Sequence, residues 1–186
     1  MKSSTLKGIV LAIAAAGAVT AFNFMPAKTA LQGKKAPDFS AIATDGKKHS
    51  LDGELKDGMV FMYFIKEGCP VNHQAAPHVL KLWKAYGQKS SLLGVYSGSV
   101  SEAKSWASRY KSGSMPILED PSLKVIRAYG AAYSPWLVVV GKDGKVAKVF
   151  EGAAPKELEQ VNAMMASNAG VTKASLSFVG SPTGGG

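Results

Sequence analysis

The chemistry of this chain centres on its one cysteine. Cys69 is the only cysteine among 186 residues, so no internal disulfide and no cysteine-only zinc site can form. Lys66-Glu67-Gly68 separates it from the apolar run at residues 59–65, and Pro70 follows it. Proline suits the first turn of a helix, where its missing N–H would have no partner. A thiol at a helix N-terminus is favoured as thiolate by the macrodipole and the exposed N–H groups. The sequence therefore predicts a nucleophilic Cys69, an effect that Lys66 would strengthen and Glu67 would oppose. A buried, inert cysteine is the alternative.

A histidine follows the cysteine at a spacing that permits a second kind of chemistry. His73 lies four residues after Cys69, and this spacing places both on one face of a helix. Thiolate and imidazole are ligands that copper accepts, although two ligands do not complete a site. Copper binding by Cys69 and His73 and a merely solvated His73 therefore both stay open. We interpret His49 and His78 as surface residues.

Three continuous apolar runs predict the strands that must position the cysteine. Residues 59–65, 91–96 and 136–140 are typical of strands covered on both faces of a sheet. Between them, the helical spacing of Val79, Leu82 and Tyr86 predicts a helix that begins at Pro70 and ends at Gly87. Ser99 and Glu102 form a capping box at the start of the next helix.

Shorter signals complete this pattern of elements. We expect a hairpin in residues 38–51, a short strand at 115–118, a helix opened by Asp120-Pro121, an antiparallel strand at 146–150 and a helix from Pro155. Alternation of strands and helices predicts right-handed crossovers and a parallel sheet, to which the last hairpin adds antiparallel strands. The expected fold is an α/β three-layer α/β/α sandwich with a mixed central sheet and an extra N-terminal hairpin.

The N-terminus is typical of an export signal. Residues 1–7 are basic, and residues 8–22 form a 15-residue apolar run, the length of a signal-peptide core. We expect residues 1–30 to be a signal peptide cut near residue 21 or 30. Phe24 and Met25 extend the apolar run, so an uncleaved membrane anchor stays open. In either case the folded domain would be extracytoplasmic, periplasmic or secreted.

Composition fits one globular domain behind this signal. The chain is 46% hydrophobic, enough for a core of one domain, and its formal charge is +9. The lysines are scattered along the sequence, which favours solubility and gives no indication of nucleic-acid binding. We expect a polar linker at residues 31–37, the domain at 38–168 and a flexible Gly/Ser-rich tail at 169–186.

Several short motifs occur in an order known from one family. They are Ala36-Pro37-Asp38-Phe39, the run from Phe64 to Cys69-Pro70, Pro77 eight residues after the cysteine, Ser134-Pro135 before a strand, and Lys142-Asp143-Gly144-Lys145. Over residues 33–168 the chain resembles the thioredoxin-fold redoxins of the AhpC/TSA and TlpA-like group. The resemblance implies a thioredoxin-like fold. It also implies that Ser134-Pro135 is a cis-proline loop beside Cys69, where Pro135 orients the incoming partner.

The sequence departs from this family at positions that matter for the reaction. Asn72 stands where thioredoxins have a second, resolving cysteine. Peroxiredoxins have proline and threonine where this chain has Met62 and Lys66, and Trp136 follows Pro135 where the peroxiredoxin arginine is expected. The dithiol cycle needs a second thiolate, so this chain cannot complete it alone.

The resemblance therefore implies a thiol oxidoreductase with one redox cysteine, supported by Lys66, Pro70, Asn72, Ser134 and Pro135. Cys69 would attack a protein disulfide or a small peroxide, and an external thiol would restore it. We expect no cofactor, and contact with a membrane only through an uncleaved N-terminal segment. The alternative is a binding module that has kept the scaffold without catalysis, so enzymatic activity stays an open question.

Overall fold

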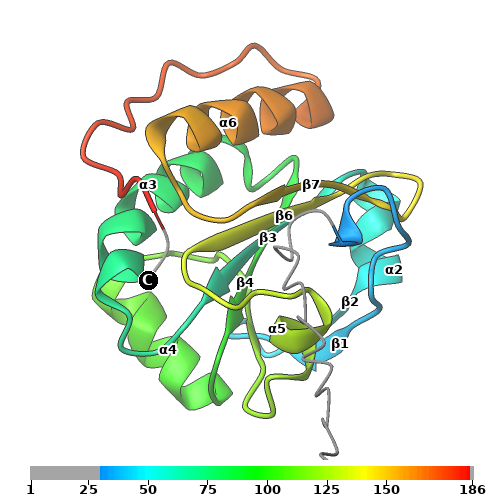
Figure 1. The fold of residues 1–186 in the computed structure, drawn as a ribbon, viewed down its shortest axis with the longest axis vertical. Helices are drawn as coiled ribbons and strands as arrows, with labels where there is room; N and C mark the ends of the chain where they lie inside the picture. Colours follow the sequence, from blue (N-terminus) through cyan, green and yellow to red (C-terminus); the bar gives the residue numbers. More distant parts are fainter. Residues whose placement is uncertain (1–29, 185–186) are drawn as a thin grey trace, which may run out of the picture.

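The computed structural model describes residues 30–184, which form a central sheet covered by helices on both faces (Figure 1). Its elements are β1 (Ser40–Ile42), β2 (Lys48–Ser50), α2 (Leu51–Glu54), the 3-10 turn η1 (Leu55–Asp57), β3 (Val60–Ile65), α3 (Pro70–Tyr86), β4 (Ser91–Tyr96), α4 (Val100–Tyr110), β5 (Ile117–Glu119), α5 (Lys124–Ala128), β6 (Trp136–Val140), β7 (Val146–Phe150) and α6 (Pro155–Ala169). The expected signal peptide falls on residues 1–29, outside the described part. Within residues 30–184, no helix is long and apolar enough to cross a membrane.

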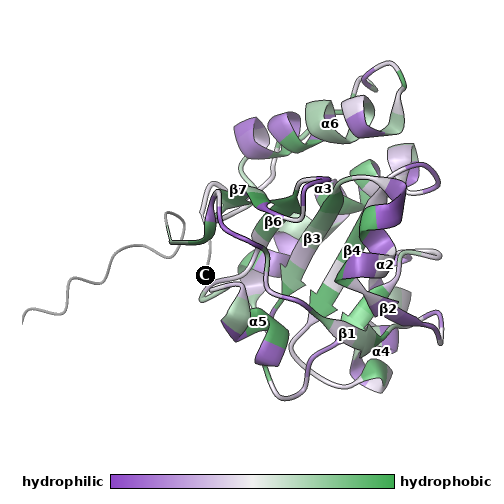
Figure 2. Cartoon of the chain, turned by 90° about the vertical axis from the view of Figure 1, so that its right-hand side faces the viewer, coloured by the Kyte–Doolittle hydropathy of each residue, from purple (hydrophilic) through white to green (hydrophobic). Residues whose placement is uncertain are grey.

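The central sheet is mixed, as predicted. Its strand order is β5-β4-β3-β6-β7, with β3 parallel to β4 and antiparallel to β6. All six residues of β3 are buried because helices cover both faces of the strand. Side chains alternate between two cores, so Phe61, Tyr63 and Ile65 face α3, α4 and α6, while Val60, Met62 and Phe64 face α2 and α5. Figure 2 shows the strands of the central sheet as mostly hydrophobic.

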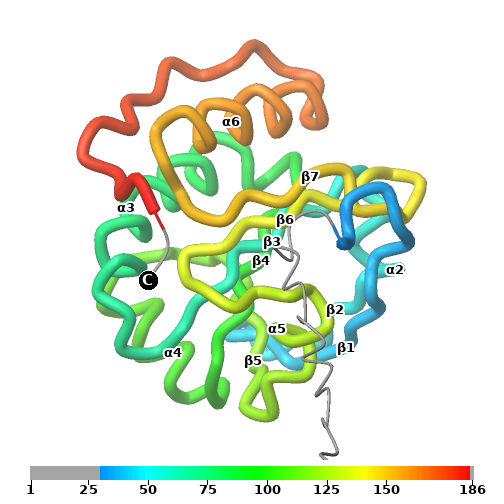
Figure 3. Tube along the Cα trace, viewed as in Figure 1, coloured from blue at the N-terminus to red at the C-terminus, as the bar shows by residue number. Residues whose placement is uncertain are grey.

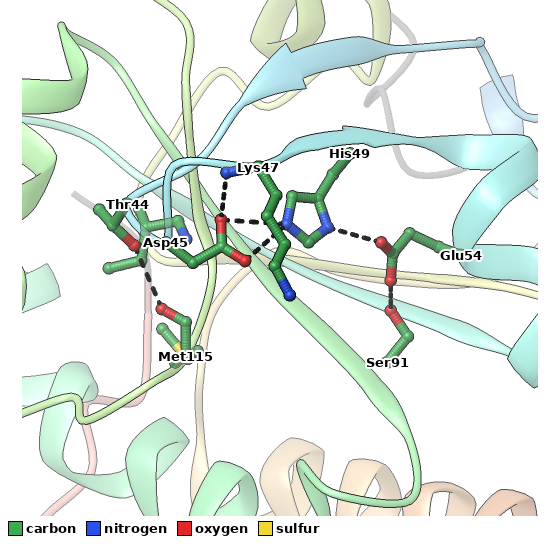
Figure 4. Close-up of polar contacts among 8 residues, drawn as sticks. Thr44, Asp45, Lys47, His49, Glu54, Ser91 and Met115 are labelled. Carbon is green, nitrogen blue, oxygen red and sulfur yellow. Dashed lines mark hydrogen bonds and ion pairs between the residues drawn. The ribbon is translucent and has the colours of Figure 1, made fainter.

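The predicted N-terminal hairpin is present, and polar contacts hold it to the rest of the domain. β1 and β2 pair antiparallel, and Thr44 joins their turn to β5 by accepting a hydrogen bond from the Ile117 N–H at 3.1 Å. His49 lies between the carboxylates of Asp45 and Glu54, at 3.1 and 2.7 Å, and Glu54 also accepts a hydrogen bond from Ser91 (Figure 4). Burial opposes the charged ring, but the hydrogen bonds that the ring donates to both carboxylates raise the pKa of His49 above its ordinary value.

Helix starts follow the sequence signals with one exception. The capping box of Ser99 and Glu102 at α4 is confirmed. The prediction that Asp120 caps the next helix directly is wrong, because α5 begins at Lys124 and its N-cap residue is Leu123, in the left-handed region. Residues 121–123 form a turn, over which the Asp120 carboxylate accepts hydrogen bonds from the N–H groups of Lys124 and Ile126, both at 2.8 Å. The Asp120 carboxylate therefore still binds the N-terminal N–H groups of α5, although Asp120 lies three residues before the N-cap residue.

The segment expected as a flexible tail packs against the domain over most of its length. Residues 171–184, called here the C-terminal strap, run back beside α6 toward α3 (Figure 3). Phe178 is buried against the core, and Ser181 donates a hydrogen bond to the Ala153 carbonyl at 2.6 Å. The strap also covers His78, which was expected at the surface; burial, together with nearby Lys81, lowers the pKa of His78.

The segment expected as a linker is also paired with the domain. Ala36 is buried, and Lys35 forms an antiparallel bridge with Lys145 at the turn between β6 and β7. The Gly33 N–H donates to the Val146 carbonyl at 2.8 Å, and the Val146 N–H donates to the Lys34 carbonyl at 2.9 Å. Residues 33–36 therefore extend the sheet edge.

Candidate redox site

Cys69 lies at the start of α3, one short loop after β3. It is the N-cap residue of the helix, and Gly68 before it has a φ of +69°, which permits the sharp turn from strand to helix. Only 7% of Cys69 is exposed. Its Sγ donates a hydrogen bond to the Ser134 carbonyl oxygen at 3.3 Å. The thiol therefore sits between the first turn of α3 and the loop before β6, and the exposed residues 66–68 precede it.

The loop before β6 is fixed against the end of β3 by one hydroxyl group. Ser134 Oγ donates to the Phe64 carbonyl and accepts from the Lys66 N–H, both at 3.2 Å. The peptide bond between Ser134 and Pro135 is cis, and both residues are buried. The structure thus brings together Cys69, Pro70, Ser134, Pro135 and the backbone of Lys66, while the Lys66 side chain is exposed.

Asn72 is turned away from solvent, into the core beneath α3. It is 2% exposed, and its Oδ1 accepts a hydrogen bond from the Tyr63 hydroxyl. Tyr63 comes from the centre of β3, and complete burial raises the pKa of its phenol well above the ordinary value. Sequence reasoning missed Tyr63; the only signal was one hydroxyl within an otherwise apolar strand.

His73 is tied to α4. Its Nδ1 forms a hydrogen bond with the Tyr110 hydroxyl, and the Tyr110 ring lies against Trp106 with centroids 4.7 Å apart. Burial raises the pKa of Tyr110, an effect that neighbouring Arg109 opposes. Among residues 30–184, no group of three or more His, Cys, Asp or Glu side chains is placed to hold a metal ion. The geometry thus gives His73 a partner within the protein.

A cavity of about 390 Å³ lies on the other side of the Ser134 loop. Its walls are mostly apolar, and Tyr133, which is 53% exposed, stands at this cavity. The lining residues are Phe64, Ile65, Lys66, Glu67, Ser97, Leu123, Ile126, Ala131, Ala132, Tyr133 and Ser134. The sequence does not reveal this cavity, because its walls come from four separate segments that the fold brings together.

The arrangement of strands, the cysteine at a helix start and the adjacent cis proline define a redoxin with a thioredoxin-like fold. The family model described as "AhpC/TSA family" matches residues 32–149, more than half of the chain. The chain belongs to the AhpC/TSA family.

Relatives of known name agree with this assignment. The thiol-disulfide oxidoreductase ResA of Geobacillus thermodenitrificans is 30% identical over 152 residues, covering 80% of this chain and 86% of the relative. Among solved structures, the thioredoxin domain of a thiol-disulfide oxidoreductase from Bacteroides vulgatus has a TM-score of 0.62 at 22% identity, covering 72% of this chain and 97% of that one. The exposed lipoprotein thioredoxin Etrx1 of Streptococcus pneumoniae has a TM-score of 0.56 at 26% identity, covering 67% and 99%. The predicted thioredoxin-like α/β fold is thus confirmed.

Proposed function

We propose that this protein is an extracytoplasmic thiol-disulfide oxidoreductase that works with one redox cysteine. The observation that carries the proposal is the position of Cys69, with Sγ 3.3 Å from the Ser134 carbonyl beside the cis peptide bond of Pro135. Relatives of the family are named thiol-disulfide oxidoreductases, which supports the same reaction class.

The proposed reaction is a thiol exchange in two steps. The Cys69 thiolate attacks one sulfur of a partner disulfide, so that a Cys69–partner disulfide forms and the other partner sulfur leaves as thiolate. An external thiolate then attacks the mixed disulfide, restores the Cys69 thiolate and takes over the bond to the partner. Asn72 supplies no second thiol, and its side chain is engaged with Tyr63, so the mixed disulfide waits for the external thiol. Pro135 and the apolar cavity beside Ser134 would contact the partner chain.

The test compares the wild type with Cys69→Ser and Asn72→Cys on a peptide containing one disulfide. The wild type should give a mixed disulfide by intact mass and stall until a small thiol is added. Asn72→Cys should release reduced peptide without added thiol, because the new thiol can resolve the bond. Asn72→Ala is the matched control, since it also removes the bond to Tyr63 but adds no thiol. A wild type that forms no mixed disulfide would refute the proposal and favour a binding module.

Export is a separate part of the proposal, supported by the basic residues 1–7 and the apolar run at 8–22. Cells producing the full chain with a C-terminal tag should be fractionated and the N-terminus of the mature chain determined by mass spectrometry. Recovery outside the cytoplasm is the expected result, with a new N-terminus near residue 22 or 31 for a cleaved signal. Recovery in the cytoplasm would contradict export.

A further inference from the structure

Four lysines that are scattered in the sequence meet at one corner of the domain. The bridge between Lys35 and Lys145 joins residues 34–35 to the turn between β6 and β7, which begins at Lys142. The side chains of Lys34, Lys35, Lys142 and Lys145 are all exposed. We call this group the basic corner.

The charges of the basic corner are poorly compensated by the protein itself. Lys35 and Lys145 lie opposite each other across an antiparallel bridge, where like charges repel and destabilise the pairing. Among the ion pairs of residues 30–184, one reaches the corner, a 4.0 Å contact between Lys145 and the exposed Asp143. An anionic surface outside the domain would reduce the repulsion among these lysines.

The chain leads from this corner toward its apolar N-terminal run. That run ends at Met25, nine residues before Lys34 in the sequence. Even a fully extended chain of that length spans only roughly 30 Å. If the apolar run enters a membrane, on its way through or as an anchor, the basic corner is the part of the folded domain that is held next to the lipid headgroups.

The direction of β3 and β6 sets where the redox site would then face. Val60 at the start of β3 pairs with Val140, which precedes the turn of the corner. β3 has six residues and spans about 20 Å, and Cys69 follows its other end. Contact at the corner would therefore leave the Cys69 loop directed away from the surface and open to partners.

We propose that the basic corner docks the domain onto a bilayer surface that carries anionic headgroups. This proposal does not depend on the redox reaction. It predicts attraction that grows with the anionic lipid content and disappears in high salt, because each lysine close to such a surface contributes about a fivefold gain in binding. At 1 M salt the Debye length is only about 3 Å, which screens the attraction.

The test is a lysine footprint of the full chain on vesicles of phosphatidylcholine with or without phosphatidylglycerol. Both vesicles give the N-terminal segment the same apolar environment, so a difference between them reports on charge. Acetylation of Lys35 and Lys145, measured by mass spectrometry, should fall at least about threefold on the anionic vesicles and recover in high salt. Lys104 and Lys111, in and after α4, lie away from the turn between β6 and β7 (Figure 1) and should label equally on both.

Charge-matched variants complete the test. Lys35→Gln/Lys145→Gln should abolish the protection of Lys34 and Lys142, whereas Lys104→Gln/Lys111→Asn, which removes the same charge, should preserve it. Asn suits position 111 because Lys111 has a φ of 50°. Equal labelling of Lys35 and Lys145 on the two kinds of vesicle would overturn the proposal. Protection of Lys104 and Lys111 to the same degree as Lys35 and Lys145 would also overturn it. Protection by dissolved polyglutamate but not by anionic vesicles would assign the corner to an acidic protein and also overturn it.

Discussion

At the residue scale, the polar atoms around Cys69 are held by neighbours that the sequence pattern does not reveal. The spacing of Cys69 and Pro70 predicts a thiol at a helix start, and that is its observed position. The contact of Asn72 with Tyr63 was not predictable, because the hydroxyl of one strand residue and the amide of a helix residue meet only when α3 packs on β3. Local patterns show which residues are buried, but not which buried polar atoms become partners.

Tyr63→Phe tests the importance of this buried contact. The substitution removes the hydroxyl and leaves Asn72 Oδ1 buried without that donor, which should lower the free energy of unfolding by about 1–3 kcal/mol. Urea unfolding gives the difference. Tyr133→Phe is the control, since Tyr133 is 53% exposed and its loss of a hydroxyl should change stability by less than about 0.5 kcal/mol. Equal stability of wild type and Tyr63→Phe would show that the contact contributes nothing.

At the element scale, the sequence predicts helices and strands well where burial requires a regular pattern of apolar residues. It predicts them poorly where one side chain stabilises an element from several residues away. The three apolar strands were predicted because burial on both faces requires continuous apolar runs. The start of α5 was not, since the Asp120 carboxylate reaches over a turn to cap it. The packing of the C-terminal strap was not predicted for another reason. Its composition is that of a loop, and Phe178 is the one aromatic residue in it that packs in the core.

Phe178→Ala should detach the strap. Phe178 is 4% exposed and packs in the core formed with α3 and α6, so truncation should cost about 3–5 kcal/mol of the free energy of unfolding. Val179→Ala is a neighbouring control with the opposite environment, because Val179 is 85% exposed and should be nearly neutral. Hydrogen exchange should show faster exchange at the Ala174 N–H, which donates to Tyr86, only in Phe178→Ala. Similar effects of both substitutions would contradict the packing.

The contacts of His49 make the attachment of the hairpin depend on pH. The folded-state pKa of His49 is raised, so its stabilisation is complete below the unfolded value near 6.5 and is lost as the pH rises through the folded value. The pKa of Asp45 is lowered despite its partial burial, by hydrogen bonds from the Lys47 N–H and His49; its contribution is present above the unfolded value of 3.8 and is lost as the pH falls through the folded value. The hairpin is therefore held most firmly between these two unfolded values.

The measurement is the difference in unfolding free energy between wild type and His49→Gln at two pH values. This difference should be larger near pH 5.5, where the His49 ring is charged, than near pH 8.5. The change should be only about 0.5–1 kcal/mol, because solvent screens these partly exposed pairs. Lys48→Gln, on the same strand, serves as the control for a change of charge alone. A difference that does not vary with pH would show that folding leaves the pKa of His49 unshifted.

At the scale of the whole molecule, one sheet separates two cores and carries different surfaces at its two ends. The candidate redox site lies after one end of β3, between α3 and the loop before β6, and the basic corner lies near the other end. Resemblance to the redoxins predicts the first from Cys69, Ser134 and Pro135. The second could not be foreseen, because its lysines are separated by more than 100 residues in the sequence and meet only through pairing with β7.

The most direct test of the central claim is the rate at which Cys69 exchanges with a small disulfide in the folded chain. With one cysteine, the reaction with a chromogenic aromatic disulfide has a single product, and Cys69→Ser gives the background. The folded chain is expected to react at least about tenfold faster than the same chain in denaturant, because the fold places the sulfur at the start of α3, beside the loop of Ser134 and Pro135. A folded chain that reacts only after unfolding would show Cys69 to be an inert core residue and would contradict the redox function.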